Sequence, residues 1–265
     1  LHWASHSLRE RGRASTLEFD GETQRLDLRL RAGLGAGVTL DVNLPWQRHR
    51  GGSLDAAIDG WHAFWSLPDG ARDAQPRDRL RFAYPGDGGF VLDSPSAGIG
   101  DVEASLEKRV AGGDSWAASA LLQVKTATGR RDDFTGSGEI AVGVGLRFST
   151  QHCVFATLSC HLQAGVVDVG ESRLAQSGQE YLAFGGLSLA WRFGPVWALL
   201  AQLDAHGSVY DDAPLDSGGA PLWGTLGLRW QPAPGWRFEG AFSEDLAVGT
   251  APDVTFLLRL ERDFP

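Results

Sequence analysis

The sequence predicts an all-β protein, a transmembrane antiparallel β-barrel of about 12 strands with one short amphipathic helix in a large extracellular insertion. Three observations carry this prediction. Apolar and polar residues alternate along most of the 265-residue chain, short glycine- or proline-rich turns alternate with long polar loops, and tryptophans lie near the expected strand ends. Because strand side chains point to opposite faces with period two, this alternation gives one face suited to lipid and one suited to a polar lumen.

The clearest pair of strands lies at residues 23–46. Leu26, Leu28 and Leu30 alternate with charged residues, and a glycine-rich joint at residues 33–37 leads into a second alternating run. Glycine tolerates the positive φ that a tight hairpin turn requires. This stretch therefore predicts a hairpin with one leucine face and one charged face.

Residues 47–98 interrupt the alternation and are predicted to be one large insertion. Within it, residues 53–67 carry apolar residues at spacings of four, three and four, which place a single apolar stripe on a helix that Ser53 can cap. Residues 80–93 predict a hairpin too short to span a membrane. Such a helix can pack on the barrel rim, gate its mouth, or present its stripe to another protein, and these alternatives stay open. The stripe consists of Leu54, Ile58, Trp61 and Trp65.

The alternation returns at residue 99 and persists to the end of the chain. Short turns on one side and long loops on the other are typical of outer-membrane barrels, whose turns are periplasmic and whose loops are extracellular. With residues 1–8 as the first strand, both chain ends fall on the short-turn side. The short turns are residues 33–37, 111–114, 194–195 and 232–235, and the long loops are residues 47–98, 127–138, 171–180, 211–221 and 244–252. The tryptophans expected in an aromatic girdle are Trp46, Trp116, Trp191, Trp197, Trp230 and Trp236.

The polar face of the predicted strands carries charges of both signs. A barrel of this size lies between small barrels filled by side chains and large ones that leave a channel. The lumen is therefore either a narrow pore or a closed interior held by ion pairs. The predicted lumen-lining residues are Arg25, Asp27, Arg29, Arg31, Asp41, Glu103, Glu107, Arg109, Arg147, Arg192, Asp204, His206, Arg229, Arg237, Glu239, Arg259 and Glu261.

Catalysis and cofactor binding find little support in the sequence. His206 and Ser208 share a strand face with Asp204, but neighbours on one face lie about 6–7 Å apart along a strand, against about 3 Å for a Ser–His hydrogen bond. The histidines show no spacing that favours a metal site, and the net charge of −9 argues against nucleic acid as a partner. We expect no enzyme activity, no catalytic residues, no cofactor and no metal.

The only two cysteines of the sequence, Cys153 and Cys160, are seven residues apart. A disulfide between them fits an oxidising compartment such as the periplasm, and the alternative is a pair of buried free thiols. We expect a signal peptide upstream of Leu1 and a location in the bacterial outer membrane.

Four segments resemble an uncharacterised family of Gram-negative outer-membrane proteins, known only as a domain of unknown function. They are LEFDGETQRLDLRLRAGL (17–34), LPWQRHRGGSLDAAIDGWHAFWSLPDGARD (44–73), SAGIGDVEASLEKRV (96–110) and PDVTFLLRLERDF (252–264). The resemblance implies a single barrel domain over residues 1–265, exported by a signal peptide, and carries over no catalytic residues. A short run, SAGIGD, also resembles segments of outer-membrane transporters of hydrophobic compounds.

These observations favour a porin-like transport protein, a narrow channel or binding site for small molecules, hydrophobic ones included. The alternative is a structural or partner-binding barrel in an envelope complex, and the third is an outer-membrane enzyme that modifies lipid. The expected partners are outer-membrane lipid and either a small-molecule solute or another envelope protein.

Overall fold

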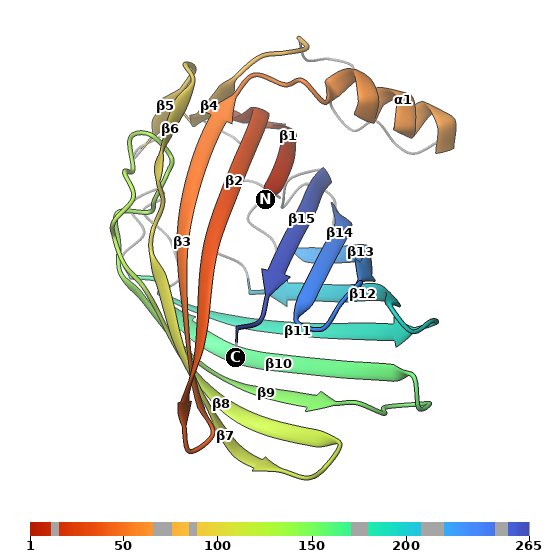
Figure 1. The fold of residues 1–265 in the computed structure, drawn as a ribbon. Coiled ribbons are helices and arrows are strands. Elements are labelled where there is room, and N and C mark those ends of the chain that lie inside the picture. Colours follow the sequence, from red (N-terminus) through yellow and green to blue (C-terminus); the bar gives the residue numbers. More distant parts are fainter. Residues whose placement is uncertain are drawn as a thin grey trace.

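The computed structural model describes residues 1–11, 16–65, 76–84, 89–170, 180–207, 220–246 and 254–264. Twelve antiparallel strands close into a barrel, because β2 pairs with both β1 and β3 (Figure 1). The predicted fold class is confirmed. The wall strands are β1 (His2–Arg11), β2 (Thr16–Gly35), β3 (Val38–Arg50), β7 (Glu103–Gly112), β8 (Trp116–Lys125), β9 (Ala141–Thr150), β10 (Leu158–Asp168), β11 (Tyr181–Arg192), β12 (Trp197–His206), β13 (Leu222–Trp230), β14 (Trp236–Asp245) and β15 (Val254–Arg262).

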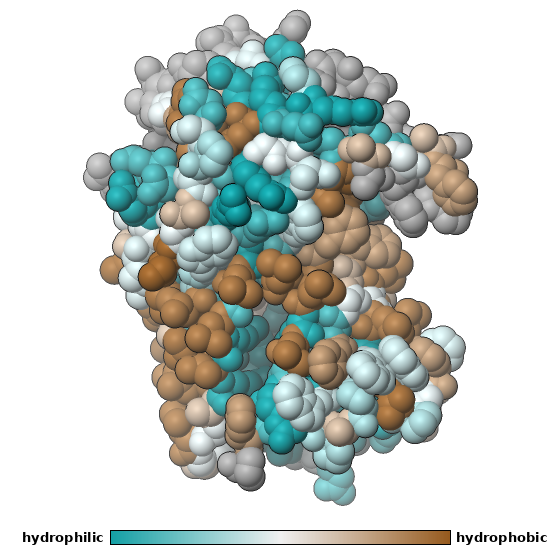
Figure 2. Space-filling model, turned by 45° about the horizontal axis from the view of Figure 1, so that its top comes forward, coloured by the Kyte–Doolittle hydropathy of each residue, from teal (hydrophilic) through white to brown (hydrophobic). Residues whose placement is uncertain are grey.

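The outward face of the wall is apolar, as the alternation predicts. Leu26, Leu28 and Leu30 are 55%, 60% and 66% exposed, and this exposure is favourable only against lipid. Figure 2 shows hydrophilic residues gathered over the upper part of one face and hydrophobic residues across its middle and lower left, around a hydrophilic hollow. The six tryptophans expected in the girdle are all between 36% and 44% exposed. Near the short turns they stack on one another or on phenylalanines, as in the pair Trp197–Trp230, whose ring centroids lie 5.9 Å apart.

The wall extends beyond this apolar band at the long-loop end. Past Leu26 and Trp46 the outward positions are Gln24 and Arg48, which form a cross-strand pair. Strand β3 therefore does not end at Trp46, and the insertion begins after Arg50 rather than at residue 47. The alternation of apolar and polar residues does not reveal this end of β3, because both faces of the strand are polar once it leaves the membrane. At the other end of the insertion β6 (Ser96–Ile99) pairs with β3.

The insertion contains α1 (Asp55–Trp65) and a ribbon of β4 (Arg81–Tyr84) and β5 (Phe90–Leu92) that extends the sheet from β2. The helix is shorter than the predicted 53–67, and Ser53 is not its cap. Instead, both carboxylate oxygens of Glu22 face the start of the helix: Oε1 accepts from the backbone N–H of Leu54 at 2.5 Å and from that of Ser53. Among the described residues no helix is long and apolar enough to cross a membrane.

Glu22 lies on the same strand face as Leu26 and has no exposed surface. Its Oε2 also accepts from the indole N–H of Trp3 at 2.7 Å and from Arg50 at 3.5 Å. A carboxylate at a helix N-terminus satisfies backbone donors that have no partner inside the helix and interacts favourably with the helix dipole. Strand β2 therefore fixes the start of α1.

We expect the substitution Glu22→Gln to loosen α1 from the wall by roughly 1–2 kcal/mol, because a neutral amide accepts these hydrogen bonds less strongly. Proteolysis of the purified barrel in detergent measures the effect as faster cleavage within α1. Arg77→Gln is the control, since Arg77 is exposed and pairs with Asp59 at 2.7 Å, and such surface pairs contribute little. Equal cleavage of the Glu22→Gln variant and the unmodified protein contradicts this account.

Candidate functional site

The inner face of the barrel carries ion pairs on two parts of the wall that flank β1. On β2, β3 and β7, Arg25 Nε donates to Asp27 at 2.8 Å and its Nη2 to Glu103 at 3.0 Å. Asn43 donates to the same Asp27 at 2.8 Å, and Arg29 donates to Asp41 at 2.6 Å. These predicted lumen residues thus form a paired network rather than a row of free charges.

The second network joins β13, β14 and β15. Glu239 accepts from Arg229 at 2.7 Å and lies 3.7 Å from Arg259, whereas Glu261 lies 2.5 Å from Arg237 and 3.2 Å from Arg259. All five were predicted to line the lumen, and the structure brings them together.

Of the seven predicted lumen residues outside both networks, three line the cavity described below and four do not. Arg109 is exposed at the end of β7 and donates to the carbonyl of Gly113, so it belongs to the rim turn. Arg192 is the exposed last residue of β11. Asp204 accepts from Gln202, and the His206 imidazole bonds the Gly207 carbonyl at 2.7 Å. For Arg109 and Arg192, alternation indicates the correct face but not the height along the barrel.

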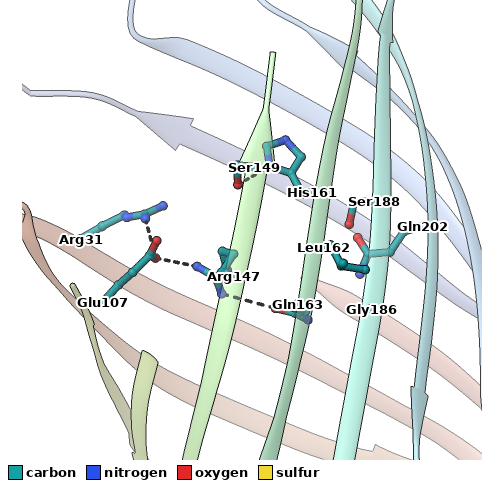
Figure 3. A pocket seen from close by; sticks show the side chains of 10 residues that line it. All are labelled: Arg31, Glu107, Arg147, Ser149, His161, Leu162, Gln163, Gly186, Ser188 and Gln202. Atoms are coloured by element: carbon teal, nitrogen blue, oxygen red, sulfur yellow. Dashed lines mark hydrogen bonds and ion pairs between the residues drawn. The ribbon is translucent and has the colours of Figure 1, made fainter. Parts of the chain in front are cut away.

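A cavity of about 460 Å³ opens on the lumen toward the short-turn end (Figure 3). Three charged side chains stand on one side of it: Glu107 accepts from Arg147 at 2.6 Å and from Arg31 at 3.4 Å. Two guanidinium groups thus share one carboxylate, which leaves a net charge of +1 in this trio. The cavity is lined by Arg31, Glu107, Arg147, Ser149, His161, Leu162, Gln163, Gly186, Ser188 and Gln202.

The other side of the cavity is uncharged. His161 and Ser149 are hydrogen-bonded at 2.9 Å, Gln163 accepts from Arg147 at 3.4 Å, and Ser188 and Gln202 complete the lining. None of these five residues was predicted to line the lumen, because neutral polar residues between apolar ones resemble those of any strand surface. Their polar character is visible in the sequence, but their common location depends on strand register.

At the long-loop end, residues 127–138 cover part of the lumen face of β3 and β6. The backbone oxygens of Thr135, Phe134 and Asp133 bond to Gln47, His49 and Ser96 at 3.0, 3.0 and 2.8 Å. These three partners lie on the lumen face of β3 and β6. The segment thus folds inward against the wall.

Asp101 holds the base of this inward segment. It is 7% exposed and accepts from the backbone N–H groups of Gly129 and Ser137 at 2.9 and 2.8 Å, and from Lys125 Nζ at 2.8 Å. An isolated buried carboxylate is costly, but one that accepts several hydrogen bonds and an ion pair is stabilised. Phe134 of the segment packs on Phe90, with ring centroids 5.0 Å apart.

Two histidines lie beneath this cover and are linked through Thr23. The Thr23 hydroxyl is 2.9 Å from His6 Nε2 and 2.9 Å from His49 Nδ1, and Phe82 packs edge-on to both rings. The cluster lies beyond the apolar band, level with Gln24 and the residues past it. Burial lowers the pKa of His6 to about 4, and it lowers the pKa of His49 as well. Both imidazoles are therefore neutral at pH 7.

The remaining predicted sites have mixed outcomes. A disulfide joins Cys153, in the turn after β9, to Cys160 in β10. In the predicted helix stripe Ile58 is 3% exposed, whereas the side chains of Trp61 and Trp65 lie outside the described residues. The gate or docking role of the stripe, including Leu54, stays a prediction. Ser208 also lies outside the described residues. The catalytic grouping of Ser208, His206 and Asp204 that the sequence analysis considered therefore has no geometry to support it.

Comparisons with known proteins agree with this architecture. A family model described as "Protein of unknown function (DUF3187)" matches residues 7–264. The chain is similar to the COG4313 outer membrane channel from Pseudomonas putida F1, with 15% identity, a TM-score of 0.60, and coverage of 99% of this chain and 92% of that chain. The KdgM porin is similar at 10% identity and a TM-score of 0.49, with 100% of both chains covered. No curated protein that was compared matches the chain. The fold is that of an outer-membrane channel.

Proposed function

We propose that this chain, which belongs to the DUF3187 family of proteins of unknown function, forms a narrow outer-membrane channel for small polar solutes. The observation that carries the proposal is the polar cavity of about 460 Å³ on the inner face of a barrel with an apolar outer face. This volume is typical of sites for small molecules. The chemistry of its lining favours polar solutes over the hydrophobic ones that the sequence left open.

The electrostatics of the cavity give a specific expectation. Arg31 is the more exposed of the two guanidinium groups, with 58% of its side chain accessible against 30% for Arg147. Arg147 and Glu107 balance each other, so Arg31 supplies the excess positive charge. An open cavity of this composition should favour anions weakly. A closed, ion-paired interior should conduct nothing.

We expect Arg31→Gln and Glu107→Gln to shift ion selectivity in opposite directions. The first leaves a neutral pair and favours cations, and the second leaves two guanidinium groups and favours anions. A unit charge about 6 Å from an ion in a water-like medium changes its energy by about 0.7 kcal/mol, which is about threefold in relative permeability. Reversal potentials across a planar bilayer with a salt gradient measure both shifts.

Arg109→Gln is the matched control, because Arg109 lies at the rim turn and should change the reversal potential little. Shifts of the same sign for Arg31→Gln and Glu107→Gln would contradict the assignment of the cavity to the ion path. Conductance at the level of the bare bilayer in every variant would exclude a channel and leave a structural or partner-binding barrel as the better account.

A further inference from the structure

A row of uncharged polar side chains runs across the inner wall from strand to strand. Its members are paired partner to partner in the sheet register: Ser149 with His161, His161 with Ser188, and Ser188 with Gln202. The same row continues from Gln202 to Thr225, from Thr225 to Ser243, and from Ser243 to Thr255. These seven residues, named here the polar row, occupy seven neighbouring strands, β9 to β15.

The polar row faces the lumen along its whole length. Its first four members line the cavity, as Figure 3 shows for Ser149, His161, Ser188 and Gln202. The last three share strand faces with lumen charges four residues away, as Thr225 does with Arg229. The cavity is therefore the start of the row at the short-turn end.

Past Thr255 the same line of register partners passes through the small apolar Ala4 and reaches the other end of the barrel. Thr255 pairs with Ala4, Ala4 with Thr23, and Thr23 with His49, beneath residues 127–138. Strands are spaced about 4.8 Å apart and tilt by about 40° in a barrel, so a perpendicular row climbs about 3 Å per strand. Nine steps from β9 to β3 climb on the order of 25–30 Å, the height of the apolar band of an outer-membrane barrel.

The next row toward the short-turn end is small or apolar, which leaves the polar row accessible. It runs from Ala190 through Leu200, Gly227 and Ala241 to Leu257. A β-carbon on Gly227 would lie only 2.7 Å from that of Ala241, so the inner wall is closely packed at this place. Hydrogen-bonding groups thus lie beside a surface that can contact C–H groups.

We propose that the polar row is a track for uncharged polyhydroxylated solutes, that is, sugars and related polyols. This inference rests on the proposed channel function and names its substrate class. Hydroxyl, amide and imidazole groups both donate and accept hydrogen bonds, so they match a solute whose hydroxyls do the same. Because the row offers a new partner at each strand, a solute exchanges one hydrogen bond at a time and is never fully desolvated without compensation.

Liposome swelling tests the inference with glucose as the probe and planar-bilayer KCl conductance as the reference. The variant combines Ser188→Ala, Thr225→Val and Ser243→Ala, which remove hydroxyls without narrowing the lumen. We expect glucose entry to slow about fivefold or more, as several hydrogen bonds are lost, while KCl conductance stays within about twofold. The control variant combines Ser105→Ala and Ser119→Ala. Both serines lie on the lumen face, on β7 and β8, but outside the row, so this variant should leave glucose entry unchanged.

The outcomes separate the two proposals. An unchanged or faster glucose rate in the triple variant overturns the track, and so does an unmodified protein that conducts KCl but excludes glucose. In both cases the channel itself stands. An unmodified protein without KCl conductance overturns the channel and the track together. If the triple variant does not insert, Ser188→Ala alone repeats the measurement with an expected decrease of about twofold, and no decrease overturns the track.

Discussion

A tryptophan at Gly186 is expected to block the passage, and a tryptophan at the adjacent Gly185 is expected to leave it open. Successive strand residues point to opposite faces, so the two substitutions place the same side chain on the two sides of one wall. Gly186 lines the cavity, whereas Gly185 alternates with it and shares the outward face of Leu187. The two variants therefore have the same amino-acid composition and differ only in whether the indole points into the cavity.

The space around Gly186 accepts a side chain at modest cost. A β-carbon there would meet the Oδ1 atom of Asp204 at 2.7 Å and the Nε2 atom of Gln163 at 3.1 Å, which are the ends of flexible side chains. Beyond them the indole would extend into a cavity of about 460 Å³. A β-carbon on Gly185 would meet only a carbonyl oxygen at 3.7 Å, and lipid accommodates the indole.

We expect single-channel conductance to fall on the order of tenfold for Gly186→Trp and by less than about twofold for Gly185→Trp, because pore width limits conduction. Heat-dependent mobility on gels reports whether both variants are folded. Equal conductance in two folded variants would show that ions and solutes pass elsewhere, and the assignment of the cavity would be wrong.

The wall of the barrel could be predicted because each strand carries its own evidence. Leu26, Leu28 and Leu30 indicate a lipid face without knowledge of any neighbour, and turn lengths then order the strands. The resemblance of four segments to an uncharacterised outer-membrane family is confirmed by the match over residues 7–264. Local alternation and turn chemistry thus determine most of the architecture.

The site could be predicted only in part, because it depends on which residues become neighbours. Charge alone identified Arg31, Glu107 and Arg147 as lumen residues, but Ser188 and Gln202 carry no such signal. Their place in the polar row follows from the pairing register of β11 with β12. A one-residue slip of that register would turn one strand's members to the lipid face.

The insertion shows a second limit of sequence reasoning. Its helix has a local signature and was found, but the N-terminal cap comes from Glu22, more than thirty residues upstream of Leu54 in sequence. The inward cover at residues 127–138 has a polar composition, which predicts an exposed loop. Hydrogen bonds with Asp101 and with β3 side chains instead hold the loop against the lumen wall. These residues become neighbours of the loop only in the folded barrel.

Acid is expected to release the inward cover at residues 127–138 through His6 and His49. Phe134 offers a carbonyl oxygen, so His49 donates to it from Nε2 and its Nδ1 accepts the Thr23 hydroxyl proton. The Thr23 oxygen then accepts from His6 Nε2. This order of donors requires His49 to be neutral. A proton on its Nδ1 removes the acceptor for Thr23 and places a charge beside Phe82.

The sign follows from the pKa of His6, which burial lowers from 6.5 to about 4, with a smaller contribution from His49. Below pH 6.5 an undocked, hydrated His6 binds a proton that the docked side chain does not. Docking is therefore fully stable above pH 6.5 and is weakened as the pH falls toward 4, by at most about 3 kcal/mol for this group. The lowered pKa of His49 acts in the same direction.

Hydrogen exchange of the backbone amides at residues 127–138, corrected for intrinsic rates, measures this release between pH 7 and pH 4.5. We expect protection to fall on the order of tenfold or more, with the loss shared by the ribbon of β4 and β5 that carries Phe82. His6→Gln keeps an N–H donor toward Thr23 but does not titrate, so its pH dependence should be shallower. Protection that is equal at both pH values, or equally pH-dependent in His6→Gln, would mean that the cover is held independently of His6, by Asp101 and Gln47.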